Sequence, residues 1–204
     1  MSVAIVILAG GLGTRIGGDK ALRPLQGRAL IEWVLQAVRS QGDEVLISAN
    51  GNAEALAQYG CPVIADRMSG HAGPLAGVQA AARETACDWL ASVPCDAPFL
   101  PQDLIARLQA AADAAGADAA VAMTAGRRQP AIALYRHSVL QKLNAYLADG
   151  GRKVATWQDS LRLQQAEFDD AAAFINLNSA QELALANQII DNGGTHDDIR
   201  RVLA

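Results

Sequence analysis

The feature that most constrains the fold is an apolar run that opens directly into a glycine-rich loop near the N-terminus. The run covers residues 3–7, and its β-branched residues without polar breaks predict a buried parallel strand. Five glycines follow between positions 10 and 18, so that the backbone can approach a ligand where a Cβ would clash. Arg15 and Lys20 add two cations to the same stretch. Together these residues predict a polyphosphate site at the end of the strand.

Two common phosphate-binding motifs do not fit this loop. A dinucleotide fingerprint that starts at Gly11 requires glycine at position 16, which is Ile16. A Walker A motif that starts at Gly13 has Asp19 inserted before Lys20 and lacks the following Ser or Thr. An ordinary strand-to-helix turn needs only one or two glycines. The sequence therefore favours a third kind of phosphate loop.

Composition indicates a soluble cytoplasmic enzyme. The 204 residues are enough for one domain, expected over residues 1–191, with a polar C-terminal tail over residues 192–204. Hydrophobic residues make up 51% of the chain, but no apolar run is as long as a membrane span and no signal peptide is evident. The net charge of −4 argues against nucleic-acid or membrane binding. Three cysteines without C-x-x-C spacing indicate reduced thiols and no zinc site.

Strand and helix patterns alternate along the first half of the chain. Strands are expected at 3–7, 44–49, 62–65 and 88–93, and helices at 29–38, 53–58, 75–85 and 101–114. This alternation predicts a three-layer α/β/α fold with a mostly parallel sheet. The second half is less regular, with strands expected at 119–123 and 131–135, a cationic turn at 124–130 between them, and a helix at 138–147. Ser179 with Glu182 forms a capping-box pattern for a further helix.

Polar residues follow the expected strands, where the carboxyl ends of a parallel sheet bind ligands. Asp96 follows a buried strand between two prolines, and a carboxylate there suits Mg²⁺; Pro101 starts the next helix too far away for Asp96 to cap it. Asp66 could bind a ribose hydroxyl, a base edge or the metal, or form an Asx-turn. Asn50 could contact a base or occupy a turn. These residues and the loop are expected to converge at one edge of the sheet.

Two asparagines and two cation pairs are further candidates. Asn176 and Asn178 alternate, so in a strand both would face the same side, although Asn178 could instead help to cap the following helix. The cations could hold an anionic second substrate or simply be solvated on the surface; they are Arg127, Arg128, Arg152 and Lys153. The three histidines have no metal-ligand spacing, and no arrangement for covalent catalysis is readable.

At these residues the chain resembles the molybdenum cofactor guanylyltransferase (MobA-type) family of nucleotidyltransferases. The first motif of that family stands here as Leu8-Ala9-Gly10-Gly11 followed by Arg15-Ile16-Gly17-Gly18-Asp19-Lys20, with Ile16 in place of the usual Met. Further matches are Gly-Pro-Leu-Ala-Gly at 73–77, Pro-Cys-Asp-Ala-Pro at 94–98, and the segments 129–134 and 174–178. The match extends to about Asn187 and is looser at 179–183, where the family usually continues Thr-Pro-Glu-Asp/Glu-Leu.

The resemblance implies a Rossmann-like nucleotidyltransferase fold and transfer of GMP from GTP to the terminal phosphate of molybdopterin. It implies GTP contacts at Leu8, Ala9, Gly10, Gly11, Lys20, Asn50, Asp66 and Asp96, with Mg²⁺ on Asp96. Arg15, Lys20 and Asp96 would be the catalytic residues, and the four cations with Asn176 and Asn178 would contact the pterin or pyrophosphate. Proteins that load molybdopterin and acceptor molybdoenzymes are the expected partners. The alternatives are a cytidylyltransferase or sugar-phosphate nucleotidyltransferase of the same fold, or a non-catalytic nucleotide-binding module.

Overall fold

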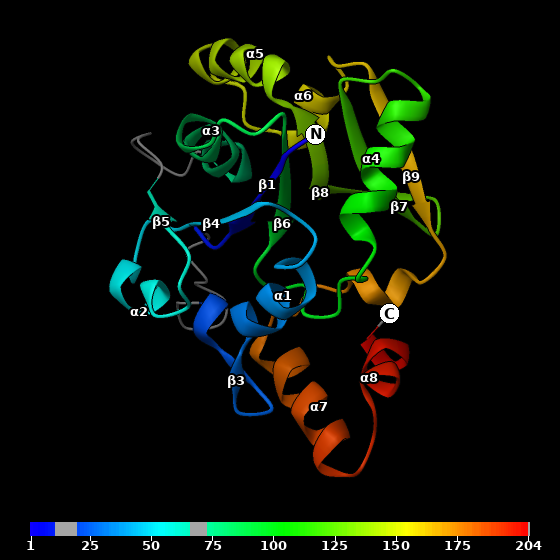
Figure 1. Cartoon of the computed structure of the whole chain (residues 1–204). Helices are drawn as coiled ribbons and strands as arrows, with labels where there is room; N and C mark the ends of the chain where they lie inside the picture. The colour runs from blue at the N-terminus through cyan, green and yellow to red at the C-terminus, as the bar shows by residue number, and fades with distance from the viewer. Residues whose placement is uncertain (11–19, 66–72, 204) are drawn as a thin grey trace.

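A seven-stranded sheet forms the centre of the molecule, with helices on both of its faces (Figure 1). The computed structural model describes residues 1–10, 20–65 and 73–203. The strand order is β5-β4-β1-β6-β8-β7-β9. This arrangement confirms the expected three-layer α/β/α fold.

The sheet is mostly parallel. The parallel half consists of β1 (Val3–Leu8), β4 (Glu44–Ser48), β5 (Val63–Ile64) and β6 (Trp89–Pro94). The other half consists of β7 (Ala119–Thr124), β8 (Arg127–Arg136) and β9 (Leu163–Phe168). β8 runs antiparallel to both β6 and β7, whereas β9 runs parallel to β7. β9 was not predicted, because its sequence LQQAEF has polar residues at three of its first five positions and lacks the apolar run of the other strands.

The helices form two layers because successive residues of β1 face opposite sides of the sheet. α1 (Leu30–Val38) and α4 (Leu104–Ala114) pack on one face, with Ile5 and Ile7. α3 (Pro74–Glu84), α5 (His137–Ala148) and α6 (Val154–Gln158) pack on the other, with Ala4 and Val6. Strand β1 is therefore buried on both faces, as its continuous apolar run predicts.

A third apolar cluster lies beside the first helix layer and holds the C-terminal segment. It joins β2 (Pro24–Leu25), which pairs with β3 (Arg28–Ala29), to α7 (Ala180–Asp191) and α8 (His196–Leu203). In α8 the side chain of Ile199 is fully buried in this cluster, so residues 192–203 pack against the rest of the chain. The boundary at residue 192 stays a prediction. Shorter elements are η2 (Lys20–Leu22), α2 (Ala53–Ala57) and η3 (Ala171–Phe174).

The strand register brings three strand ends to one edge of the sheet. Leu8, the last residue of β1, pairs with Ser48 at the end of β4 and with Pro94 at the end of β6. The chain therefore leaves all three strands at the same level, and the residues that follow them are neighbours. We call this side of the sheet the carboxyl edge.

The β7–β8 hairpin reaches the same edge, because β8 begins there and runs back. Its turn is only two residues long, Ala125 and Gly126, with φ of 47° and 70°. Two successive positive φ values are typical of the tight turn that matches strand twist. The expected seven-residue turn at 124–130 was therefore wrong: Arg127 and Arg128 belong to β8 and pair with Thr124 and Met123.

No helix in the described part of the chain is long and apolar enough to cross a membrane.

Candidate functional site

The centre of the candidate site is an ion pair between Lys20 and Asp96. Lys20 opens η2, whereas Asp96 follows β6 directly, so the pair joins segments 76 residues apart in the sequence. The ammonium Nζ of Lys20 donates to Oδ2 of Asp96 and, at 2.7 Å, to Oδ1 of Asn178. The side chains of Lys20 and Asp96 are 19% and 9% exposed. The structure thus brings the predicted lysine and carboxylate together at the carboxyl edge.

The backbone around Asp96 is fixed on both sides. The N–H of Cys95 donates to the carbonyl of Leu8 at 3.2 Å, which ties the end of β6 to the end of β1. The carbonyl of Asp96 accepts from the N–H of Leu177 at 2.9 Å. The next helix, α4, has Asp103 as its N-cap residue. Asp96 is therefore not a helix cap, and its carboxylate faces Lys20.

Burial shapes the chemistry of the neighbouring thiol. It raises the pKa of Cys95 to about 12, helped by the adjacent Asp96 carboxylate and opposed by Lys20. At neutral pH the thiol is therefore protonated and inert.

The ends of β1 and β4 supply the other side of the site. The N–H of Ala9 donates to the carbonyl of Ser48 at 2.8 Å. A Cβ built on Gly10 would lie 3.8 Å from Nδ2 of Asn50, which is ordinary van der Waals contact. Contacts with the described residues therefore leave room for a side chain at position 10. Asn50 lies at this edge, as predicted.

Three of the predicted site residues, Gly11, Arg15 and Asp66, lie outside the described residues.

The Gly-Pro-Leu-Ala-Gly motif has a structural explanation at each end. Gly73 precedes α3 with φ of 72° and ψ of −172°, a conformation that glycine adopts readily, and Pro74 occupies the first turn. Gly77 lies on the face of α3 that packs against the strand ends. A Cβ there would lie 2.6 Å from Oγ of Ser48 and 2.8 Å from Cδ2 of Leu8. The second glycine therefore lets α3 approach β1 and β4 directly beneath the site.

The segment that contains the two asparagines is not a strand. Residues 175–178 connect η3 to α7, where the side chain of Ser179 accepts from the N–H of Glu182 and completes the predicted capping box. Asn176 and Asn178 consequently do not share a face: Oδ1 of Asn176 is buried and has no hydrogen-bond partner among the described residues, whereas Asn178 is exposed and contacts Lys20. The expectation failed because no strand in the described part of the chain pairs with this segment, and its backbone N–H groups donate to Asp96 and to Glu182 of the helix cap instead.

In each cation pair one side chain is held by the protein. Arg128 forms an ion pair with Asp159 at 2.6 Å, and Nη1 of Arg152 donates to the carbonyls of Leu147 and Gly151 at 2.9 and 2.7 Å. Arg152 therefore bonds one carbonyl in the last turn of α5 and one in the loop that follows the helix. Arg127 and Lys153 are exposed, and their side chains form no hydrogen bond or ion pair with the rest of the described chain. These two cations remain available to an anionic ligand.

Two buried polar residues that the sequence analysis missed support the hairpin. The register between β7 and β8 shifts after the pair Val121–Ala133, and the next pair is Ala122–Gln129, so residues 130–132 have no partner residue in β7. Nε2 of Gln158, at the end of α6, donates to Pro130 at 3.0 Å, and Oγ of Ser92 donates to Ala131 at 2.9 Å. A buried Gln or Ser within an apolar element is the signal that could have identified such supports.

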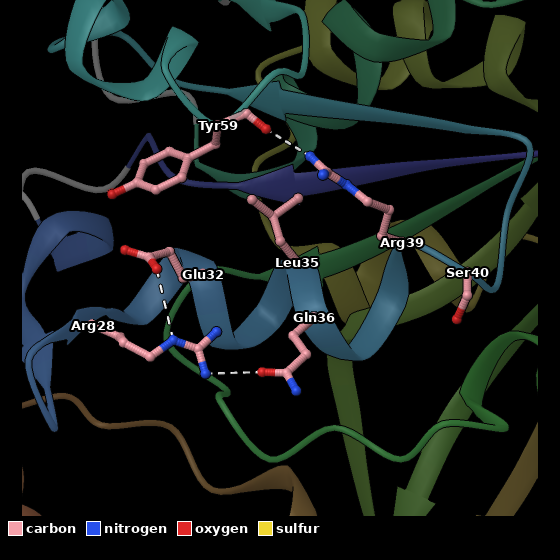
Figure 2. Close-up of a pocket in the computed structure, with 7 residues that line it drawn as sticks. All are labelled: Arg28, Glu32, Leu35, Gln36, Arg39, Ser40 and Tyr59. Carbon is pink, nitrogen blue, oxygen red and sulfur yellow. Dashed lines mark hydrogen bonds and ion pairs between the residues drawn. The ribbon is translucent and has the colours of Figure 1, made fainter.

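A hollow of about 450 Å³ lies away from this site, along α1 (Figure 2). Its arginines contact groups of the same chain: Arg28 donates to Gln36 at 2.9 Å, and Arg39 donates to the carbonyl of Tyr59 at 2.6 Å. Burial and the nearby carboxylate of Glu32 raise the pKa of Tyr59. Because its charges are satisfied internally, we assign no ligand to this hollow.

A metal site formed by protein ligands alone is not present: no three His, Cys, Asp or Glu side chains in the described ranges cluster at metal-binding distance. A single buried carboxylate such as Asp96 nevertheless suits Mg²⁺, which commonly takes one or two carboxylates and completes its shell with phosphate oxygens and water. The donor set at the carboxyl edge is therefore compatible with a magnesium ion that arrives with a nucleotide.

Comparison with known families decides between the folds that share such an edge. The MobA-like NTP transferase domain matches residues 5–166. The chain belongs to this family. The match includes both ends of the Lys20–Asp96 pair but stops before Asn178.

Related proteins align with most of this chain. The molybdenum cofactor guanylyltransferase of Cupriavidus necator is 46% identical over 184 residues, which cover 87% of this chain and 92% of that protein. The protein of the same name from a Shewanella species (strain ANA-3) is 41% identical, with 89% and 93% covered. Molybdopterin-guanine dinucleotide biosynthesis protein A from Archaeoglobus fulgidus has the same fold, with a TM-score of 0.77, 26% identity, and 93% and 99% of the two chains covered. Like other members of its family, the chain is a nucleotidyltransferase.

Proposed function

We propose that this MobA-like transferase moves GMP from GTP to the terminal phosphate of molybdopterin and releases pyrophosphate. The product is molybdopterin guanine dinucleotide. The observation that carries the proposal is the Lys20–Asp96 pair at the carboxyl edge, where the strands that lead to Gly10 and Asn50 also end. Relatives named for this guanylyl transfer cover nearly nine-tenths of the chain, which supports the choice of GTP.

The reaction requires one new P–O bond and one broken P–O bond. An oxygen of the molybdopterin phosphate attacks the α-phosphorus of GTP, and the bridging oxygen between the α- and β-phosphates leaves with the bonding electrons as pyrophosphate. The attacking phosphate is already anionic at neutral pH, so no strong base is required. The protein contributes by positioning both anions and by balancing the charge on the leaving group.

Lys20 is the residue that can balance this charge. Its ammonium lies at the strand ends, largely screened from solvent, and phosphate oxygens would be strong partners for it there. Gly10 is proposed to let the nucleotide approach the backbone, because it has no side chain, and the amide of the neighbouring Asn50 is proposed to contact the base. Arg15 and Asp66 are proposed for the phosphates and the ribose, base or metal, respectively, on sequence grounds.

Asp96 is the proposed Mg²⁺ ligand. When bound there, the ion would neutralise phosphate charge and hold the phosphate oxygens in place. The carboxylate is fixed for this role by the backbone bonds of Cys95 and Leu177 on either side of it. In the chain as described, Lys20 neutralises the same carboxylate.

The second substrate is proposed to bind beside the hairpin and the α5–α6 connection. The side chains of Arg127 and Lys153 are exposed and form no hydrogen bond or ion pair within the described chain, which supports a contact with the pterin phosphate or with pyrophosphate. Arg128 and Arg152 act mainly through the backbone and side chains they hold. Cytoplasmic location and exchange of cofactor with loading and acceptor proteins remain part of the proposal.

The test is pyrophosphate release with molybdenum-loaded molybdopterin and Mg²⁺, compared among GTP, CTP, ATP and UTP. Release with GTP alone is expected. Release with CTP instead would keep the fold and the site but replace the base assignment. No release with any of the four, from protein shown to be folded, would contradict the proposal and favour sugar phosphates as acceptors or a non-catalytic binding module.

A further inference from the structure

The ammonium group of Lys20 has two oxygen partners of different charge. One is the carboxylate of Asp96, and the other is the amide oxygen of Asn178, at 2.7 Å. Asn178 lies 158 positions further along the chain and beyond the residues that the family match covers. The bond therefore connects Lys20 to a segment that lies outside the residues matched by the family model.

The orientation of the Asn178 amide is set by its other contacts. Its Nδ2 donates to the carbonyl of Asn176 at 3.2 Å, which leaves Oδ1 directed at Lys20. An ammonium can only donate, so this orientation is also the one that Lys20 requires. The Asn176 carbonyl and the Lys20 ammonium thus favour the same orientation of the amide.

The backbone at Asn178 is anchored independently of its side chain. Its N–H donates to Oε2 of Glu182 at 2.6 Å, and the same oxygen accepts from the N–H of Ser179 at 2.9 Å. One residue earlier, the N–H of Leu177 donates to the carbonyl of Asp96. The cap of α7 and the end of β6 therefore hold Asn178 in place, and truncating its side chain removes none of these bonds.

We infer that Asn178 is a positioning residue that holds the Lys20 ammonium in the site when a nucleotide and its cation engage Asp96. This inference rests on the proposed function. Once the carboxylate binds a cation, Lys20 loses its charged partner, and Asn178 is the remaining protein oxygen bonded to it among the described residues. The lysine is then held for the phosphates instead of moving into solvent.

The neutral charge of the amide is central to this role. An amide oxygen accepts a hydrogen bond from an ammonium without cancelling its charge, so Lys20 keeps its full attraction for phosphate. An aspartate at position 178 would hold Lys20 equally well but would compensate its charge and repel the nucleotide. An asparagine that contacts the pterin directly would have no such dependence on Lys20.

The test is a double-mutant cycle on binding of GTP in the presence of Mg²⁺ and without molybdopterin. Asn178→Ala is expected to weaken GTP binding by roughly fivefold or more, since Lys20 loses a charge-assisted hydrogen bond that places it. Asn178→Asp is expected to weaken it further. In the Lys20→Met background, Asn178→Ala is expected to cause little additional loss. Asn192→Ala, an exposed asparagine at the other end of α7, is the matched control and should bind GTP as the wild type does.

The outcomes separate this inference from the proposed function. Equal effects of Asn178→Ala with and without Lys20 would overturn the positioning role, as would unchanged GTP binding with a raised KM for molybdopterin alone. Wild-type protein that binds GTP but forms no guanine dinucleotide would contradict the proposed function, while the cycle would still report on Asn178. Thermal unfolding of each variant checks that the fold is intact.

Discussion

The close approach of α3 to the strand ends makes Gly77→Ala a sharp test of how the site is built. The added Cβ would lie 2.6 Å from Oγ and 3.2 Å from Cβ of Ser48, and 2.8 Å from Cδ2 of Leu8. Ser48 is 4% exposed and Leu8 ends β1, so the nearest atoms belong to the two strands that lead into the site. The leucine methyl can rotate away, but the serine is part of a fixed strand end.

Two opposing effects determine how much Gly77→Ala changes the free energy of unfolding. Overpacking a filled site typically costs about 1–3 kcal/mol, whereas alanine gains about 1 kcal/mol over glycine inside a helix. We therefore expect Gly77→Ala to lower the free energy of unfolding by about 1 kcal/mol, or roughly 2–4 °C in melting temperature for a chain of this size. GTP binding should weaken as well, because α3 is pushed away from the ends of β1 and β4.

The assay is chemical denaturation combined with GTP binding. Gly51→Ala is the matched control, since its Cβ would meet nothing within 4 Å, and it should be neutral. Adding Ser48→Gly to Gly77→Ala removes the serine contacts, so the double variant should lose less stability than the sum of the single variants. A Gly77→Ala protein as stable as the wild type, or strictly additive effects, would refute this account of the packing.

Four further perturbations address the catalytic, binding and buried polar groups. Asp96→Asn should reduce pyrophosphate release about a hundredfold or more at saturating Mg²⁺ while the melting temperature is retained, because the site loses its carboxylate; normal activity would remove the metal assignment. Lys153→Ala should raise the KM for molybdopterin about tenfold and leave GTP binding unchanged, and a selective loss of GTP binding would contradict its assignment. Gln158→Leu should cost about 2 kcal/mol or more in urea unfolding, since it removes the buried donor to the Pro130 carbonyl and to the Tyr135 hydroxyl; wild-type stability would contradict this. Burial raises the pKa of Tyr135 from 10.0 to about 12, so the unfolded chain ionises first and stability should fall between pH 10 and 12. Tyr135→Phe should flatten that slope, and an unchanged slope would show that another group is responsible.

The parallel half of the fold could be predicted because its strands are buried on both faces. Continuous apolar runs such as β1 leave little choice of structure, and the order of strands and helices then places their carboxyl ends together. Asp96 and Lys20 were predicted as partners in one site for this reason. The sequence pattern placed both residues near the ends of parallel strands, and in the structure they form an ion pair there.

The rest depended on contacts that local pattern does not encode. The polar strand β9 is stabilised by its pairing with β7. The long strand β8 pairs with both β6 and β7. Asn178 acquires its partner from a segment at the opposite end of the chain, which no spacing rule indicates. The cation pairs looked equivalent in sequence, yet Arg128 is tied by an aspartate that follows a short helix. Long-range packing, rather than propensity, decides such positions.

The most direct test of the central claim follows the α-phosphate of GTP. The protein is incubated with Mg²⁺, molybdenum-loaded molybdopterin and GTP that carries a radiolabel in either the α- or the γ-phosphate, and the pterin product is isolated. The account predicts that the α-label appears in a pterin dinucleotide and the γ-label only in pyrophosphate, and that Lys20→Met and Asp96→Asn strongly reduce the formation of both labelled products. A γ-label in the pterin, or no label in it from folded wild-type protein, would contradict guanylyl transfer at this site.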